Sequence, residues 1–394
     1  MKKVLILGGS VLQVPLIKTA KRLNLYVIVV DINENAEGFK YADEKHYIST
    51  IDDYKIIELF KKINADGIIT AATDLPMRTI AKVGELFNLN TISYETAMNA
   101  TDKFKMRNEL AKHNVPIPKY CVATTKEEYH DSLKKIIGNK ICKPVDSSGS
   151  KGVILIDSKK NEDEAFLYAK KYSKSGEILI EEQMIGKEVS VESITIEGKT
   201  HIIAITDKLT SGAPYFTEIG HYIHSQLSQD TKNKIEKITI DAIDALRIKT
   251  GPSHTELIIT SDGPKIVEVG ARLGGDFITS HLVKYATGVD LLELHIKQSI
   301  GSTLPEKFNI KKIGAAIKYF ENAEGYLNGI SIPDKVYDDK NLIEVAITAD
   351  IHSHISQVSN SNSRIGHVIC SGENGSKAMD NCEKILKDIK IEID

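Results

Sequence analysis

The sequence has few cysteines, and their placement excludes two kinds of structure. The four cysteines, Cys121, Cys142, Cys370 and Cys382, are scattered along 394 residues and form no C-x-x-C pair. A disulfide framework or a cysteine-based zinc site is therefore not expected, and a reducing compartment suits this composition. We expect a cytoplasmic location.

Long apolar runs are also absent. No window approaches the roughly 18 consecutive apolar residues that a membrane-spanning helix needs. The opening segment MKKVLILGGS has a basic tip, but its apolar run of four residues is too short for a signal peptide and suggests a first β-strand. We therefore expect no membrane partner.

The charge balance shows no excess of either sign. Fifty-one basic residues against 54 acidic ones give a net charge of -3. This balance argues against a nucleic-acid coat or a basic membrane-binding protein, so we expect no nucleic-acid partner. With 41% apolar residues, a chain of 394 residues can build two or three domains with complete cores.

Strand-like and helix-like segments alternate along the first 90 or so residues. The short apolar runs KVLILGG, YVIVVDIN and DGIITA are separated by stretches with helical spacing. Strands that are apolar throughout and alternate with helices indicate a parallel sheet covered on both faces. The fold class is therefore α/β, beginning with a Rossmann-like domain.

The rest of the chain mixes helices and strands in a less regular order. Thr101 is predicted to cap a helix, with Asp102 favourable in its first turn. We expect helices near 126–137, 161–174, 230–247, 288–299 and 376–388, and strands that include YCVA, EILIEE, VSVESITI and THIIAIT. The predicted domains are residues 1–95, 96–190, 191–305 and 306–394.

Two carboxylates lie on a predicted β-hairpin. TELIIT and PKIVEVG form its strands, and a three-residue loop, SDG, would make Thr260 face Pro264 and Glu256 face Glu268. Facing carboxylates repel unless one is protonated or a cation lies between them, and Mg²⁺ prefers such oxygen ligands. The alternative is a solvated strand face, and a two-residue loop would place the glutamates on opposite faces.

Two segments rich in small residues invite a nucleotide-binding interpretation. In KPVDSSGSKGV, Lys143 precedes a Gly/Ser loop whose N–H groups, hydroxyls and lysines suit phosphates, although an ordinary hairpin loop has the same composition. LGGSVLQV lacks G-x-G-x-x-G, but Asp31 ends the next strand as an acidic ribose ligand would. For LGGS, a tight strand-to-helix turn is the favoured interpretation.

The motifs occur in an order that resembles the ATP-grasp superfamily, and within it the carboxylate–amine (L-amino-acid) ligases. They are TDKFKMR, the lysine before the Gly/Ser loop, ILIEEQMIGKEVSVES, SHTELIIT and VEVGARLGGD, with a C-terminal extension in RIGHVICSGENG. The resemblance covers roughly residues 1–300. It implies a Rossmann-like N-terminal domain, a central α+β lid and a C-terminal α+β ATP-grasp domain.

The resemblance also implies a role for each motif. Glu256 and Glu268 would hold the metal. Of the two catalytic residues that the resemblance implies, Lys143 would hold the nucleotide phosphates, and Arg272 would face the transferred phosphoryl group or the substrate carboxylate. Backbone groups at 181 and 184 would face adenine. The implied nucleotide-binding residues are Lys103, Lys143, Ser148, Gly149, Ser150, Gly152, Glu181, Glu182, Met184 and Glu188.

Two positions depart from the family's pattern. Many members have Glu-x-Asn at the second metal motif, whereas Gly270 stands here, so that water or phosphate would complete the metal shell. The segment SGAPYFTEIGHYIHSQLS resembles a substrate-side loop, with His224 where a proline is common. For His221 and His224, both a catalytic and a structural role stay open.

The function implied by the resemblance is that of an ATP- and Mg²⁺-dependent ligase, with Mn²⁺ as an alternative ion. It would join a small carboxylate, such as an amino acid, to an amine through an acyl phosphate, and family members suggest a homodimer. Three alternatives stay open: a carboxylating or formylating ATP-grasp enzyme of purine or biotin type, an NAD-binding Rossmann oxidoreductase, and a non-catalytic ATP-binding relative.

Overall fold

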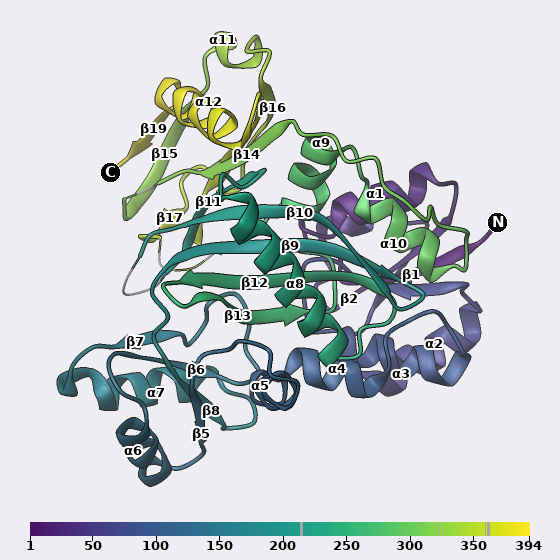
Figure 1. Ribbon diagram of the computed structural model, residues 1–394. Helices are drawn as coiled ribbons and strands as arrows, with labels where there is room; N and C mark the ends of the chain where they lie inside the picture. Colours follow the sequence, from purple (N-terminus) through teal and green to yellow (C-terminus); the bar gives the residue numbers. More distant parts are fainter. Residues whose placement is uncertain (213–215, 322, 359, 361–362) are drawn as a thin grey trace.

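The computed structural model describes residues 1–212, 216–321, 323–358, 360 and 363–394 (Figure 1). Its N-terminal part is a parallel sheet, as predicted, and its strands lie in the order β3-β2-β1-β4. The interior positions of β1 and β2 are fully buried, which explains why these strands are apolar throughout. The elements here are β1 (Lys3–Leu7), α1 (Val14–Arg22), β2 (Tyr26–Asp31), η1 (Glu37–Lys40), β3 (Glu44–Tyr47), α2 (Asp53–Ile63), β4 (Gly67–Ile69) and α3 (Met77–Phe87).

Two short helices connect this sheet to the next part: α4 (Tyr94–Thr101) and α5 (Lys103–Lys112). Asp102, rather than Thr101, caps α5, because its side chain accepts hydrogen bonds from the N–H groups of Phe104 and Lys105. Thr101 ends α4 instead, and its hydroxyl donates to the Ala97 carbonyl at 2.8 Å. The predicted cap was wrong because two helices meet here.

A small antiparallel sheet in the order β5-β8-β6-β7 forms the lid (Figure 1, lower left). Two helices pack on it and close a hydrophobic cluster of their own, which includes Tyr129, Phe166 and Ile178. The elements are β5 (Tyr120–Ala123), α6 (Lys126–Lys135), β6 (Lys140–Pro144), β7 (Ile154–Ile156), η2 (Lys159–Asn161), α7 (Glu162–Tyr172) and β8 (Ile178–Glu182).

The largest sheet has eight strands in the order β13-β12-β9-β10-β11-β14-β18-β16, and helix α8 lies across it (Figure 1). Because β11 pairs with β14, the sheet continues across residue 305, where a domain boundary is predicted. Its elements before that point are β9 (Lys187–Ile196), β10 (Lys199–Thr210), β11 (Glu218–Ile223), α8 (Gln229–Ala245), β12 (Gly251–Thr260), β13 (Gly263–Gly270), η3 (Ile278–Val283), α9 (Lys284–Thr287) and α10 (Leu291–Ser299).

The C-terminal part adds three strands to the large sheet and a separate three-stranded sheet, β17-β15-β19. Helix α12 packs against β14 and β18 and buries Ala378, Met379 and Cys382. The elements are β14 (Gly314–Tyr319), β15 (Gly325–Ser331), α11 (Asp334–Tyr337), β16 (Leu342–Ile347), β17 (His354–Ile355), β18 (Gly366–Gly372), α12 (Gly375–Asp388) and β19 (Lys390–Ile393).

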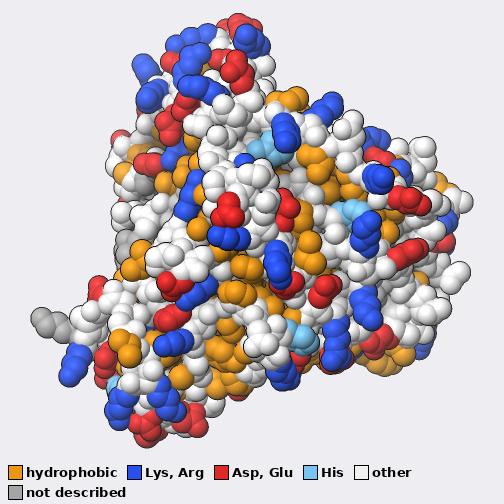
Figure 2. Space-filling view, viewed as in Figure 1, with side chains coloured by type: hydrophobic (Ala, Val, Ile, Leu, Met, Phe, Trp, Pro, Cys, Tyr) orange, Lys and Arg blue, Asp and Glu red, His pale blue; other side chains and the backbone are white. Residues whose placement is uncertain are grey.

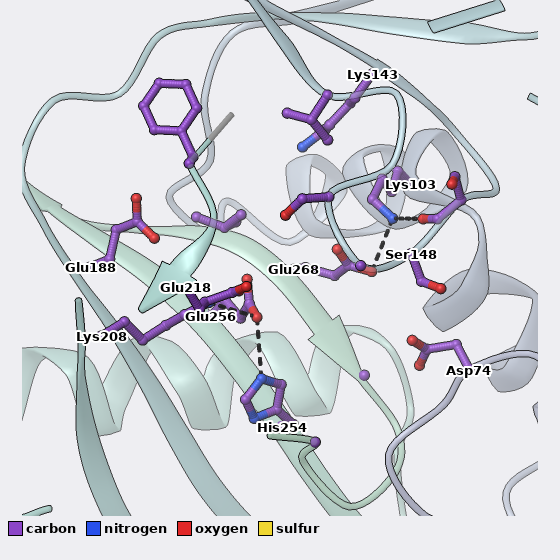
Figure 3. A pocket seen from close by; sticks show the side chains of 18 of the residues that line it. Asp74, Lys103, Lys143, Ser148, Glu188, Lys208, Glu218, His254, Glu256 and Glu268 are labelled. Carbon is purple, nitrogen blue, oxygen red and sulfur yellow. Dashed lines mark hydrogen bonds and ion pairs between the residues drawn. The ribbon is translucent and has the colours of Figure 1, made fainter. Parts of the chain in front are cut away.

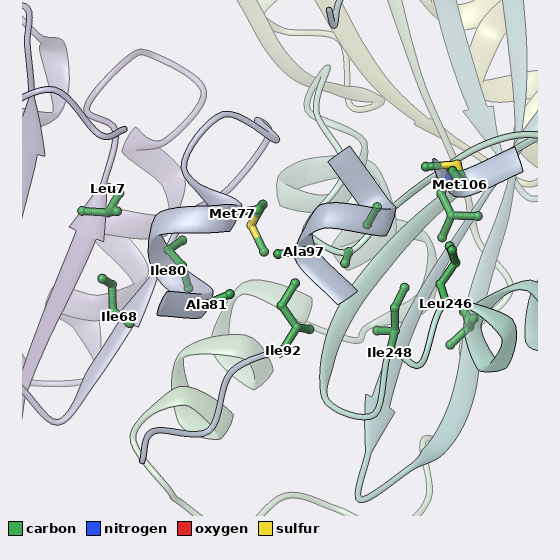
Figure 4. Packing of buried hydrophobic residues seen from close by; sticks show 14 of the residues in the cluster. Leu7, Ile68, Met77, Ile80, Ala81, Ile92, Ala97, Met106, Leu246 and Ile248 are labelled. Carbon is green, nitrogen blue, oxygen red and sulfur yellow. The ribbon is translucent and has the colours of Figure 1, made fainter. Parts of the chain in front are cut away.

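One apolar core joins the N-terminal domain to the large sheet. It runs from Leu7 and Ile68 through Ile92 to Leu246 and Ile248 (Figure 4). Each such buried side chain contributes about 1.5–3 kcal/mol of hydrophobic stabilisation, so this shared core fixes the two parts against each other. The lid cluster is separate from it.

The outer surface agrees with the balanced composition. Acidic and basic side chains are interspersed over the face shown in Figure 2. Within the described part of the chain, no helix has both the length and the apolar character that crossing a membrane requires.

Candidate active site

A cavity of about 420 Å³ lies where the lid, the large sheet and the N-terminal domain meet (Figure 3). Most of the predicted nucleotide, metal and catalytic residues line it: Lys103, Lys143, Ser148, Gly149, Ser150, Glu181, Glu182, Met184, Glu188, Glu256, Glu268 and Arg272. Gly152 is not among the lining residues. Its φ of +78° and a Cβ that would lie 2.7 Å from Pro144 show that packing requires a glycine there.

The hairpin of β12 and β13 brings Glu256 and Glu268 to paired positions, as predicted. The loop is nevertheless one residue shorter than predicted, because Thr260 pairs with Gly263 and not with Pro264. Between the turn and the glutamates the register shifts, so that Val267 has no partner of its own in the ladder. This bulge compensates for the shorter turn and returns the two glutamates to one face.

Each of the two facing carboxylates is held by a lysine (Figure 3). The Lys208 Nζ lies 2.9 Å from Glu256 Oε1 and 3.3 Å from Glu218 Oε1. The Lys103 Nζ donates to Glu268 Oε1 at 3.1 Å and to the Ser147 carbonyl at 2.7 Å. Burial alone would lower the pKa of Lys208, but the surrounding glutamates outweigh burial and raise it, so this lysine stays charged.

Behind Glu256 lies a buried charged pair. The His254 Nε2 is 3.2 Å from Glu256 Oε1, and its Nδ1 is 2.6 Å from Glu192 Oε1. Burial would lower the pKa of His254, but Glu192 and Glu256 raise it to about 9. Burial would raise the pKa of Glu256, yet Lys208 and His254 hold it well below its usual range. Glu256 is therefore an ionised carboxylate within the cavity.

The lid side of the cavity holds a second charged cluster. Glu181 accepts from Arg107 Nε at 2.5 Å through one carboxylate oxygen, and the other lies 2.6 Å from the Lys143 Nζ. Burial lowers the pKa of Lys143 and would raise that of Glu181, but Arg107 and Lys143 hold Glu181 at about 2. Lys143, which lines the cavity, is thus fixed in place by a buried acid.

Arg272 reaches the cavity in a fixed orientation. Its Nε and Nη2 each donate to one oxygen of Asp74 at 3.0 Å. A Cβ at Gly270 would lie 3.2 Å from the Arg272 Cζ and 3.3 Å from Asp74. The Arg272–Asp74 pair fills the space next to Gly270. This gives a physical reason why glycine stands here instead of the asparagine that many family members have.

The two histidines of the substrate-side segment lie in different surroundings. His221 lines the cavity, and its Nε2 is 3.4 Å from Asp276, which Arg364 binds through two nitrogens at 2.7 and 2.8 Å. His224 is not among the lining residues, and its Nε2 contacts the carbonyls of Ala286 and Lys311. These contacts favour a structural role for His224. Residues 213–215 of this segment lie outside the described part.

The glycine turn after β1 lacks the space and the available carboxylate that a bound dinucleotide would need. The Asp31 carboxylate, a predicted ribose ligand in the oxidoreductase interpretation, accepts a hydrogen bond from the Gly9 N–H at 2.7 Å. A Cβ at Gly9 would lie 3.1 Å from Ala36, so side chains already fill this turn. The turn therefore has the features of a tight strand-to-helix connection.

The donor set fits a divalent ion that shares its shell with phosphates. Glu256 and Glu268 supply carboxylate oxygens, and in the described part of the chain no three acidic, histidine or cysteine side chains converge as a metal cluster. Mg²⁺ is typically bound by one or two carboxylates together with substrate phosphates and water. The two glutamates match that requirement.

Sequence reasoning missed several residues of this site. Lys208, His254, Asp74 and Glu218 all line the cavity. His254 could have been found, because it lies two residues before Glu256 and so on the same face of the strand. Glu218 lies in the segment that resembles a substrate-side loop, although it was not singled out there, and Lys208 and Asp74 have no local pattern that marks them.

Two regions of the chain match known families. Residues 137–280 match the ATP-grasp domain, and residues 319–394 match the L-amino acid ligase C-terminal domain 2. An alanine–anticapsin ligase from Bacillus subtilis is 28% identical over 285 residues, which are 66% of this chain and 60% of that protein. A phosphoribosylamine–glycine ligase from Methanosarcina barkeri is 29% identical over 247 residues, 57% of this chain and 56% of that protein.

This chain therefore spans less than two thirds of the length of these two relatives. The crystal structure of L-amino acid ligase from Bacillus licheniformis has the same fold, with a TM-score of 0.87, 22% identity and coverage of 100% and 99% of the two chains. The chain therefore contains an ATP-grasp domain over residues 137–280. Its residues 319–394 are similar to the C-terminal domain 2 of L-amino acid ligases.

Proposed function

We propose that this protein is an ADP-forming ligase that joins a small carboxylate, such as an amino acid, to an amine through an acyl phosphate. The observation that carries the proposal is the pair Glu256 and Glu268, which face one cavity together with Lys103, Lys143 and Arg272. Such a set matches the charges of a metal–nucleotide complex beside a carboxylate substrate. The oxidoreductase interpretation leaves this set without a role.

The reaction begins when the γ-phosphoryl group of ATP passes to a carboxylate oxygen of the substrate and ADP is released. The amine nitrogen then attacks the acyl carbon, the bond to phosphate breaks, and the nitrogen loses a proton. Phosphorylation is needed because a carboxylate repels nucleophiles and oxide is a poor leaving group. The products are an amide, ADP and phosphate.

The side chains of the cavity contribute position and charge. Lys103 and Lys143 would hold the phosphates, and Arg272, oriented by Asp74, would face the transferred group. Glu256 and Glu268 would hold Mg²⁺, which neutralises phosphate charge when it is bound. The Ser148, Gly149 and Ser150 loop lines the cavity and would keep water from the acyl phosphate.

The test is an assay of ADP release with ATP, Mg²⁺ and pooled carboxylates and amines. Release that requires both pools, together with a product lighter by one water than the sum of its components, supports the ligase. Turnover with bicarbonate or formate would indicate the carboxylating or formylating alternative. Tight ATP binding with no turnover on any pool would indicate a non-catalytic relative and contradict the proposal.

A further inference from the structure

Lys208 is a buried cation in the cavity wall that has no part in the reaction described above. It projects from β10, and its side chain is only 4% exposed. Its Nζ lies between two carboxylates from the neighbouring parts of the sheet, Glu256 on β12 and Glu218 on β11. A lysine buried between two acids is held in place by its ion pairs with both of them.

The arrangement is repeated on the other carboxylate. Lys103 binds Glu268 and, as a second acceptor, the Ser147 carbonyl. Each of the two facing glutamates is thus neutralised by a lysine that also has another partner. These contacts use the Oε1 atom of each glutamate. A divalent ion that binds both carboxylates either displaces a lysine or lies beside it at Oε2, and in both cases the positive charge of the lysine opposes the ion. Each lysine has a second acceptor that it keeps.

We propose that Lys208 is a positioning residue that serves as the internal counter-cation of Glu256. In the metal-free site its ion pair holds the Glu256 carboxylate in place. When a divalent ion binds Glu256, Lys208 keeps its ion pair with Glu218. The inference rests on the proposed function, because it treats Glu256 as a metal ligand. It implies that a free divalent ion competes poorly with Lys208. The nucleotide shifts this competition because its phosphates supply further ligands.

Titration of the full-length protein with Mn²⁺, followed by the electron paramagnetic resonance signal of free Mn²⁺, tests this role with and without ADP. Lys208→Met and Lys208→Gln remove the charge, and Lys208→Arg keeps it. Lys187→Met is the matched control, because Lys187 binds the adjacent carboxylate Asp207 at 2.7 Å but is not among the lining residues.

Without ADP, either neutral Lys208 variant should bind Mn²⁺ about tenfold or more tightly than the wild type, since one of the two cations beside Glu256 is gone while His254 is the same in every variant. Lys208→Arg and Lys187→Met should stay within about twofold of the wild type. A purely structural lysine would not give tighter metal binding when removed. Thermal unfolding identifies any variant that fails to fold, and one folded neutral variant is sufficient.

Unchanged or weaker Mn²⁺ binding by the folded neutral variants without ADP would overturn the role of Lys208. Glu256→Gln separates this outcome from failure of the proposed function. Loss of ADP-dependent Mn²⁺ binding in Glu256→Gln supports the metal site, whatever the Lys208 variants do. Unchanged binding in Glu256→Gln would remove Glu256 from the metal site and the Lys208 inference with it.

Discussion

Two charged clusters face the same cavity, but the protein holds them differently. In the lid cluster, the side chains of Arg107, Glu181 and Lys143 are 1%, 4% and 6% exposed, and one acid lies between two cations. On the hairpin, Glu256 and Glu268 are 28% and 27% exposed, and each has its own lysine. The first cluster is closed to solvent, whereas the second is open to the cavity.

This difference in exposure between the two clusters indicates which ion pairs can be replaced by contacts with a ligand or a metal ion. Removing one partner from the lid cluster would leave a buried charge without compensation, so this cluster has to persist during turnover. The hairpin carboxylates can accept a different cation from the cavity without exposing a buried charge. We therefore expect the loss of Arg107 or Glu181 to reduce mainly stability, and substitutions of the hairpin glutamates to reduce mainly activity.

The largest effect is expected at the hairpin. Glu268→Gln should lower kcat/KM for ADP formation by about a thousandfold or more, because a neutral amide is a poor ligand for the ion. The melting temperature should change by no more than about 2 °C, since this side chain is partly exposed. A coupled ADP assay and thermal unfolding measure both quantities. Near-wild-type turnover would show that Glu268 is not a metal ligand.

The lid cluster should give the opposite result. Arg107→Met leaves Glu181 with a single cation and should cost about 3–5 kcal/mol in the free energy of unfolding, measured with urea. The control is Arg247→Met, which removes an exposed ion pair with Glu95 and should cost no more than about 1 kcal/mol. Equal losses in the two variants would contradict the contrast between a closed and an open cluster.

Lowering the pH should also weaken the contribution of the lid cluster to stability. Arg107 and Lys143 overcome the effect of burial and hold the pKa of Glu181 at about 2, below its ordinary 4.5. Because the folded-state value is the lower one, the stability that Glu181 contributes is present above pH 4.5 and is lost as the pH falls toward 2.

The difference in unfolding free energy between the wild type and Glu181→Gln should therefore shrink by up to about 3 kcal/mol over that pH range. Urea unfolding at a series of pH values between 6 and 2 measures it. A difference that is independent of pH would mean that Glu181 is not held ionised by its neighbours.

A smaller effect is expected behind the hairpin. A Cβ at Gly274 would lie 2.7 Å from Glu192 Oε2 and 2.8 Å from His254 Nδ1. Gly274→Ala should therefore disturb this pair and cost about 1–3 kcal/mol of stability. Gly275→Ala is the matched control, because the nearest atoms to its Cβ, in Ala72, are 3.7 Å away. Equal melting temperatures for the two variants would contradict this account of Gly274.

Local patterns were sufficient to predict much of the fold. The alternation of apolar strands and helices predicted the parallel sheet, and β1, β2 and β4 lie where the runs KVLILGG, YVIVVDIN and DGIITA place them. The pairing of Glu256 with Glu268 was also predicted, although from a loop of the wrong length. The bulge at Val267 could not be foreseen, because the Arg107 Nη2 that binds its carbonyl at 2.7 Å comes from a distant helix.

The residues that the sequence did not reveal are brought in by tertiary packing. Lys208 lies within an ordinary strand, and only the arrangement of β10, β11 and β12 in one sheet places it between two acids. Asp74 reaches Arg272 from the N-terminal domain. Such contacts between segments far apart in the sequence leave no local spacing to recognise.

Glu256 and Glu268 are expected to bind one divalent ion together, beside a nucleotide. A crystal of the protein grown with Mn²⁺ and a non-hydrolysable ATP analogue, measured for anomalous scattering, tests it most directly. We expect a peak within about 2–2.5 Å of carboxylate oxygens from both glutamates and in contact with phosphate oxygens. An anomalous peak away from both side chains, or a bound nucleotide with no ion near either glutamate, would contradict it.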